Sequence, residues 1–284
     1  MVIERAPLED ELGDVLDKAI TCAGLTCGTA ASLAEVCPEL LQNVIDYRGQ
    51  FTPDELKRLA KVLKLKQAGL TAVASGHYPL PEISGLPFCL YPLRMPHGIG
   101  VANAYLVADC SADWGILFDT GAAESPLWRS WPPPIKRIAA IFLTHYETEH
   151  SGGLPAVKQR FPGAAVFGPS HPDRPQGVVA VEDGAVVGEG NFRVTVVSTP
   201  GHTEGHHCYM VAAKNAPEGT QLLIAGDLLF AGSIGGAYYC SKHLHRSLHS
   251  VMNHRSESLV IASGHGPLTT LKNEREFNPF LTEL

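Results

Sequence analysis

The sequence lacks any apolar run of the roughly 20 residues that cross a lipid bilayer, and it contains no C-x-x-C pair of the kind found in zinc knuckles. It is also short of positive charge, because 22 Lys and Arg stand against 29 Asp and Glu and leave a formal net charge of −7. These absences argue against a membrane protein, a zinc knuckle and a nucleic-acid-binding surface. The 284 residues are 45% hydrophobic and only 18% charged, a composition typical of a folded soluble protein.

The seven cysteines are odd in number and scattered along the chain, which does not suggest a disulfide framework. We therefore expect reduced thiols. The stretch 1–7 runs into acidic residues 9–11 and has no apolar core of signal-peptide length. We expect a cytoplasmic protein that acts on a small-molecule substrate and not on nucleic acid or a membrane. Assembly into a homo-oligomer is left open.

The first part of the chain has helical periodicity. One apolar stripe runs over residues 8–19, and a second, interrupted by a proline, runs over 33–45. A third helix is predicted to begin at Thr52, with Glu55 completing a capping box. We interpret residues 1–75 as a helical N-terminal extension without visible chemistry of its own.

The remainder, residues 76–284, has the pattern of an α/β domain. It opens with a Pro- and Gly-rich stretch over 75–95 that is typical of a linker leading into an entry strand. Short β-type runs then alternate with turns and helical pieces, including a helix expected from about residue 153. The expected strands are 104–108, 115–118, 138–143, 164–167, 192–197, 209–212, 222–225 and 259–262.

The most informative stretch directly follows the β-type run at 138–143. Four side chains that can bind a metal fall within six residues there: His145, Glu147, Glu149 and His150. A loop that leaves a strand can aim such side chains at one point, and the two glycines that follow allow a sharp turn. A mixture of imidazole and carboxylate suits zinc, iron or manganese better than a metal that prefers thiolates.

Three further candidate ligands, His202, Asp227 and His265, each follow another β-type run. A lone histidine or aspartate is usually a hydrogen-bonded structural residue. Clustered histidines and carboxylates in such settings are typical instead of a metal site. Asp119, in an Asp-Thr-Gly turn, is a candidate for orienting the ligands or for a plain turn role.

Taken in order, these motifs resemble the metallo-β-lactamase superfamily over about residues 86–280, and the spacing is most like its hydroxyacylglutathione hydrolase (glyoxalase II) branch. The resemblance implies a four-layer αββα sandwich with the metals in a cleft at one edge of the β layers. It also implies two metal positions bridged by Asp227. The first would be held by His145, Glu147 and His202, and the second by Glu149, His150 and His265.

The first ligand block departs from the superfamily pattern H-x-H-x-D-H at two places. Glu147 stands where the family has histidine, and Glu149 stands where it has aspartate. A glutamate at the first of these places resembles the flavodiiron proteins, which hold a pair of non-haem irons. Carboxylate in place of imidazole makes the site harder and shifts its preference from zinc towards iron or manganese.

From this pattern we expect a metal-dependent hydrolase with two divalent or trivalent ions per chain, zinc or iron, with manganese also compatible. It would act on an ester- or thioester-like small molecule through a metal-bridging hydroxide, with Glu149 and Asp227 as catalytic carboxylates. Tyr238 and Tyr239 are candidate substrate contacts. A second hypothesis, prompted by Glu147, is a non-haem diiron protein that binds or reduces O2 or NO. A third is a binding protein with a degenerate site.

Overall fold

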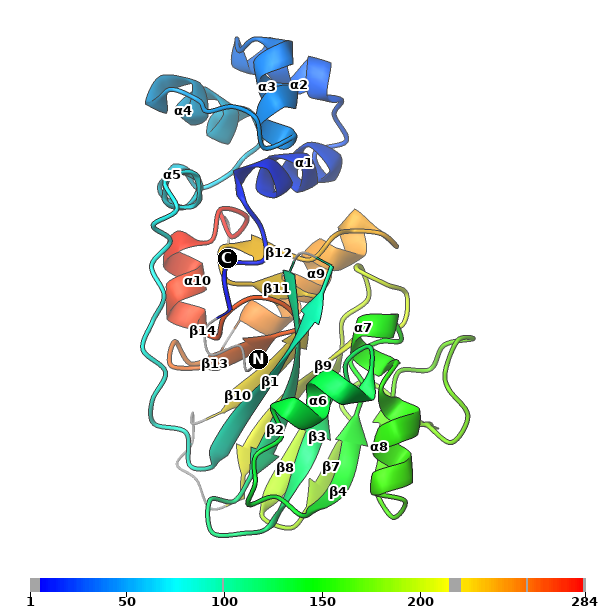
Figure 1. Cartoon of the computed structure of the whole chain (residues 1–284). Helices are drawn as coiled ribbons and strands as arrows, with labels where there is room; N and C mark the ends of the chain where they lie inside the picture. Colours follow the sequence, from blue (N-terminus) through cyan, green and yellow to red (C-terminus); the bar gives the residue numbers. More distant parts are fainter. Residues whose placement is uncertain (1–5, 99, 215–220, 254, 283–284) are drawn as a thin grey trace.

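The computed structural model describes residues 6–98, 100–214, 221–253 and 255–282. Helices come first along the chain, and two β-sheets packed face to face follow them, with helices on both outer sides (Figure 1). Within the described residues, no helix combines the length and the apolar character that a membrane span requires.

The N-terminal part is built from short helices that share one apolar cluster. Their bounds are α1 Leu12–Cys22, α2 Cys27–Ala34, α3 Pro38–Ile45, α4 Pro53–Val62 and α5 Gln67–Ala74. The capping box at α4 is confirmed, because Thr52 N donates to Glu55 Oε2 and Glu55 N donates to Thr52 Oγ1. The proline in the second apolar stripe opens α3. The boundary at residue 75 stays a prediction.

The first sheet has six strands in the order β1-β2-β3-β4-β5-β6. Its strands are β1 Cys89–His97, β2 Gly100–Ala108, β3 Trp114–Phe118, β4 Arg137–Phe142, β5 Ala165–Gly168 and β6 Val179–Ala180. The first three are antiparallel, and β3 to β6 are parallel. Three helices accompany this sheet: α6 Glu124–Arg129, α7 Thr148–Ser151 and α8 Leu154–Arg160.

The second sheet has six strands in the order β14-β13-β10-β9-β8-β7. Its strands are β7 Val186–Glu189, β8 Phe192–Ser198, β9 His207–Ala213, β10 Leu222–Gly226, β13 Val260–Ser263 and β14 Thr269–Thr270. A small hairpin pairs β11 Leu229–Phe230 with β12 Ser233–Ile234. Helices α9 Ser241–Met252 and α10 Leu271–Phe277 cover the outer face of this sheet.

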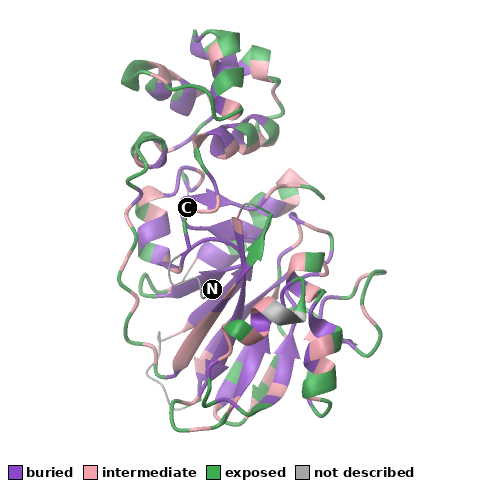
Figure 2. Ribbon diagram, in the orientation of Figure 1, coloured by how far each residue is buried: buried purple, intermediate pink, exposed green. Residues whose placement is uncertain are grey.

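Alternating side chains explain why the sheets form a four-layer sandwich. In β4, Ala140 and Phe142 join the cluster between the sheets, whereas Ile141 joins the cluster beneath α6 and α8. In β10, Ile224 faces the space between the sheets and Leu223 faces α9. A strand that is apolar on both faces must be covered on both sides. The buried strands and half-exposed outer helices in Figure 2 show this layering, and the predicted αββα architecture is confirmed.

The stretch expected as a linker over residues 75–95 is partly a strand. β1 begins at Cys89 and contains Pro92 and Pro96, which are breakers in a central strand. They are tolerated because β1 lies at the edge of its sheet, with a partner on one side only. The expected linker therefore ends before Cys89.

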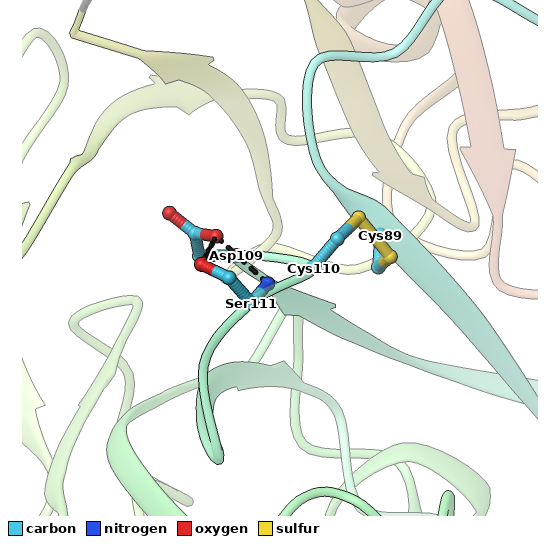
Figure 3. Close-up of a disulfide and its surroundings, with 4 residues drawn as sticks. All are labelled: Cys89, Asp109, Cys110 and Ser111. Atoms are coloured by element: carbon cyan, nitrogen blue, oxygen red, sulfur yellow. Dashed lines mark hydrogen bonds between the residues drawn. A yellow bond between two sulfur atoms is a disulfide. The ribbon is translucent and has the colours of Figure 1, made fainter.

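The expectation that all seven cysteines are reduced is wrong for one pair. Cys89 and Cys110 form a disulfide with their Cα atoms 5.2 Å apart (Figure 3). Register explains the pairing, because Cys89 lies opposite Ala108 and Cys110 follows two residues later. The turn that follows is held by Ser111, whose N–H and hydroxyl both donate to Asp109.

Candidate metal centre

Loops at one end of the two sheets bring most of the candidate ligands together. Each segment follows a strand. His145 and Glu147, with His150 on the short helix α7, come after β4, and His202, Asp227 and His265 come after β8, β10 and β13. β10 and β13 are parallel neighbours, and Gly226 pairs with Ser263. The chain segments that carry Asp227 and His265 therefore leave the second sheet side by side, at the same edge.

We call His145, Glu147 and His202 the first ligand group. One ligand atom from each of them and one from Asp227 all lie within 4.8 Å of one another. Glu147 Oε2 is 3.7 Å from His145 Nε2, and Glu147 Oε1 is 3.5 Å from His202 Nε2. His202 Nε2 is also 3.5 Å from Asp227 Oδ2.

We call His150 and His265 the second ligand group, and it meets the same aspartate. His150 Nε2 is 3.5 Å from Asp227 Oδ1, and His265 Nε2 is 3.4 Å from Asp227 Oδ2. Asp227 thus lies between the two groups, as the resemblance implied for a bridging ligand.

The histidines of both groups present the same nitrogen to the cleft. His202 Nδ1 donates to the carbonyl of Gly236 at 2.8 Å, and His265 Nδ1 donates to the carbonyl of Val101 at 3.0 Å. A carbonyl can only accept, so Nδ1 of each ring carries a proton and Nε2 is the nitrogen that faces the cleft; in the neutral ring its lone pair is directed there. This is the tautomer that a metal-binding histidine needs, with an outer partner fixing the ring.

The atoms that face each other here lack ordinary partners. Four of them are buried and have no hydrogen-bond partner in the described part of the chain: His145 Nε2, His150 Nε2, His202 Nε2 and Asp227 Oδ1. Orphaned buried polar atoms are costly and rare. Two ligand atoms about 2.1 Å from a tetrahedral cation lie about 3.4 Å apart, which is close to the spacings seen here. The residues present therefore fit metal ions.

The negative charges of the cleft carboxylates also favour the binding of cations. Burial alone would favour a neutral Asp227, but the charges of His150 and His265 hold its pKa well below the ordinary value. Contacts from His145 and His202 likewise lower the pKa of Glu147. Two anionic carboxylates in a largely buried cleft are stabilised by bound positive charge.

Asp119 supports the ligands from behind. It is buried, has a positive φ of 59°, and accepts hydrogen bonds from both N and Oγ1 of Thr144 at 2.8 Å. Its Oδ2 lies 3.2 Å from His150 Nδ1, and Thr144 Oγ1 lies 3.0 Å from His145 Nδ1. The Asp119 carboxylate thereby contacts His150 of the second ligand group directly and His145 of the first ligand group through the Thr144 hydroxyl. Of the two roles considered for Asp119, the geometry favours orientation of the ligands.

His206 is a buried neighbour that the sequence did not single out as a ligand. Its Nε2 accepts the backbone N–H of Asp227 at 3.1 Å, and its Nδ1 lies 2.8 Å from Thr199 Oγ1. Burial lowers the pKa of His206 well below the ordinary value, so the ring is neutral and its lone pair holds the backbone of Asp227.

Glu149 does not join either group, which departs from its expected role as a ligand and catalytic carboxylate. Its Oε1 lies 3.4 Å from Nε2 of His97, and its side chain is 18% exposed. The reason is helical geometry: Glu149 and His150 are consecutive on α7 and point about 100° apart. Since His150 faces Asp227, Glu149 points away from Asp227 and towards His97.

The two tyrosines differ in their relation to the centre. The Tyr238 ring is 5.1 Å from the His202 ring, and the side chain is 78% exposed, so it stands at the mouth of the cleft. Tyr239 stacks on His243 of α9, and its backbone N–H donates to the carbonyl of His202. A pocket of about 220 Å³ opens next to Glu147, with walls from Tyr146, His171, Asp173, Thr203 and Gly205.

Sequence reasoning missed one residue of this region altogether. Glu9, which precedes α1, places its Oε2 3.6 Å from Nδ1 of His265. No motif links two residues so far apart in the sequence, so only the folded chain reveals this contact.

Comparisons with known proteins agree with this geometry. Residues 97–265, more than half of the chain, match the metallo-beta-lactamase superfamily. Hydroxyacylglutathione hydrolase from Pseudomonas entomophila is 34% identical over 143 residues, which are 50% of this chain and 53% of that relative. The chain thus spans about half the length of this curated relative.

Two solved structures are similar at 28% identity and a TM-score of 0.53. One is BLEG-1 B3 metallo-beta-lactamase, where the match covers 66% of this chain and 98% of that one. The other is TTHA1623 in a di-iron-bound form, where it covers 67% and 100%. The family match, the sandwich and the clustered ligands lead to one conclusion: this chain belongs to the metallo-beta-lactamase superfamily.

Proposed function

We propose that the protein is a binuclear metal-dependent hydrolase that acts on an ester- or thioester-like small molecule. The observation that carries this proposal is the set of buried, unpartnered nitrogen and oxygen atoms that converge around Asp227. Two ions held there would supply Lewis acidity and a water of lowered pKa. The first ligand group, the second ligand group and Asp227 would hold the ions.

The chain's own residues would perform the remaining tasks. Asp227 would fix the relative position of the two ligand groups, because its two oxygens face histidines from both. His206 would keep the Asp227 backbone in place. The substrate would lie in the pocket beside Glu147, with Tyr238 at the mouth of the cleft. Tyr239, whose ring packs on α9, is the weaker candidate for substrate contact.

The relative's name suggests a first substrate to try. The activity assay would use three substrates: hydroxyacylglutathione, a simple acyl thioester and an activated ester. Protein purified without chelator would be analysed for metals by plasma mass spectrometry and then assayed for thiol release. Two zinc ions per chain with turnover would support the proposal. Full metal loading without hydrolysis of any of the three would contradict it.

A diiron protein that binds or reduces O2 or NO is the second candidate, because Glu147 supplies a carboxylate in the first ligand group. The similarity to TTHA1623, solved in a di-iron-bound form, also favours iron. Two irons per chain with an optical band that shifts on adding NO under anaerobic conditions would support this candidate over hydrolysis.

A cytoplasmic location and a homo-oligomeric state stay predictions. The Cys89–Cys110 disulfide weighs against the cytoplasm, because disulfides persist mainly in oxidising compartments. Thiol labelling of protein taken directly from its native cells would decide the state of this pair.

A further inference from the structure

A carboxylate from the N-terminal helical part of the chain lies behind the second ligand group. Glu9 precedes α1, and Figure 1 shows this segment reaching from the helices to the sandwich. Its side chain is 27% exposed, and its Oε2 is 3.6 Å from His265 Nδ1. The backbone fits closely as well, since a Cβ built on Gly266 would lie 3.3 Å from Glu9 N.

The contact repeats an arrangement found on the other histidine of the same group. His150 Nδ1 lies 3.2 Å from Asp119 Oδ2, and the Nε2 atoms of His150 and His265 both face Asp227. In His265 the Nδ1 proton is donated to the carbonyl of Val101, and Glu9 flanks that proton. Each histidine of the second ligand group therefore has a carboxylate behind it.

Neighbouring residues hold the segment in place. Asp10 is buried and contacts both Lys18 Nζ and the hydroxyl of Ser233. Lys18 also lies 5.1 Å from the centre of the Phe230 ring, and that ring packs 5.7 Å from the ring of His265. The position of Glu9 is thus fixed by a partly buried ion pair at the next residue.

The carboxylate of Glu9 has few other charged groups to pair with among the described residues. Lys18 pairs with Asp10, and the ionic partner seen for Glu9 in the described residues is His265. Burial raises the pKa of Glu9 while the charge of His265 lowers it, and nearby Asp10 and Asp227 raise it. A cation bound on the far side of His265 would stabilise a carboxylate in this place.

We propose that Glu9 is a positioning residue that orients His265 and increases its basicity as a metal ligand, so that the N-terminal helical part of the chain completes the metal centre. This inference rests on the proposed binuclear site. It goes beyond the family match, which begins at residue 97 and does not include Glu9. Outer carboxylates of this kind change metal affinity by about 10- to 100-fold.

The test is a titration of metal-free, full-length protein with Zn²⁺ against a chromophoric chelator. We expect Glu9→Gln to weaken one of two binding steps by about 10-fold or more and to leave the other unchanged. Asp17→Asn, which removes an exposed carboxylate from α1, is the matched control and should bind both ions normally. The unfolding temperature of the metal-free Glu9→Gln protein should equal that of the wild type.

A double-mutant cycle identifies the step. In a His265→Gln background the affected step is already lost, so Glu9→Gln should have no further effect on zinc affinity. Wild-type affinity at both steps in Glu9→Gln would overturn the inference and leave the binuclear site intact. Equal weakening of both steps with a lowered unfolding temperature would also overturn it, because Glu9 would then be merely structural. A wild-type protein that binds fewer than two ions would overturn the binuclear proposal as well.

Discussion

The two ligand groups meet at Asp227 but are built differently. The first ligand group supplies a carboxylate of its own, Glu147, and its histidines are held by neutral partners: the Thr144 hydroxyl and the carbonyl of Gly236. The second ligand group has no carboxylate of its own, because Glu149 faces His97. Its histidines have carboxylates behind them instead, at Asp119 and Glu9.

This contrast shows two ways of placing negative charge around the proposed metal positions. A carboxylate that binds directly hardens the first position and favours iron or manganese. Carboxylates one step removed leave imidazole as the ligand and raise its basicity, which suits zinc. In the proposed binuclear site the second position would also have fewer side-chain ligands and therefore more room for water. We expect the first position to bind its ion more tightly.

The largest effect is expected from Asp227→Ala, which removes the residue shared by both groups. Metal content should fall at both positions, from about two ions per chain to fewer than one, and hydrolysis should be lost with it. Plasma mass spectrometry of the purified variant is the measurement. Asp113→Asn, which removes a surface carboxylate paired with Arg137, serves as the control. Full retention of two ions in Asp227→Ala would show that the shared role is wrong.

Gly264→Ala should separate the two groups. A Cβ there would lie 2.1 Å from Asp227 Oδ1 and 2.8 Å from His150 Cε1, on the side of the second ligand group. We expect about one ion per chain, retained at the first position. Gly163→Ala is the matched control because a Cβ at Gly163 meets nothing within 4 Å. Equal loss of metal from both positions would mean that the added methyl group moves the whole Asp227 carboxylate, so that both ligand groups lose it.

Much of the fold was predictable because strands that are covered on both faces leave short, continuous apolar runs in the sequence. The strands around Ala140 and Ile224 are examples, since both of their faces are buried. The edge strand β1 was hidden by its prolines, which only a strand with one partner tolerates. The disulfide was hidden because its pairing depends on hairpin register, which composition does not reveal.

In the candidate site, contacts between residues that are close in the sequence were easier to predict than contacts between distant residues. His145 and Glu147 lie in one loop and converge as expected, because a loop after a strand aims alternate side chains at one point. Glu149 did not converge, because it is next to His150 on α7 and consecutive side chains of a helix point about 100° apart. The role of Glu9 could not be predicted from the sequence, since its contact with His265 arises only from tertiary packing.

Glu147 variants address metal choice in the first ligand group. Glu147→His restores the imidazole of the family pattern and should raise the bound zinc-to-iron ratio several-fold when both metals are offered in excess. The second position should keep its preference. Glu204→Gln removes a carboxylate that lies near His171 and outside both groups, and it is the control. An unchanged ratio in Glu147→His would mean that the carboxylate does not set metal preference.

The smallest effect concerns a histidine that lies outside both groups. Burial lowers the pKa of His207 to about 4, and the charge of Asp183 offsets this lowering only in part. The ordinary histidine pKa is about 6.5, so between these values the unfolded chain binds a proton that the folded chain does not. Folding stability is therefore retained above about pH 6.5 and falls as the pH drops towards 4. At pH 5 the loss amounts to about 2 kcal/mol.

His207→Gln should remove this acid sensitivity while leaving metal binding unchanged. Urea unfolding of metal-free protein at pH 7 and pH 5 measures it, and His77→Gln, which removes an exposed imidazole, is the control. The two histidines of the second ligand group differ, because Asp227 raises the pKa of His150 and His265 against the effect of burial. These two can hold protons that compete with metal, whereas His207 resists protonation. If His207→Gln were as acid-sensitive as the wild type, the loss of stability would have to arise at other buried histidines, such as His206.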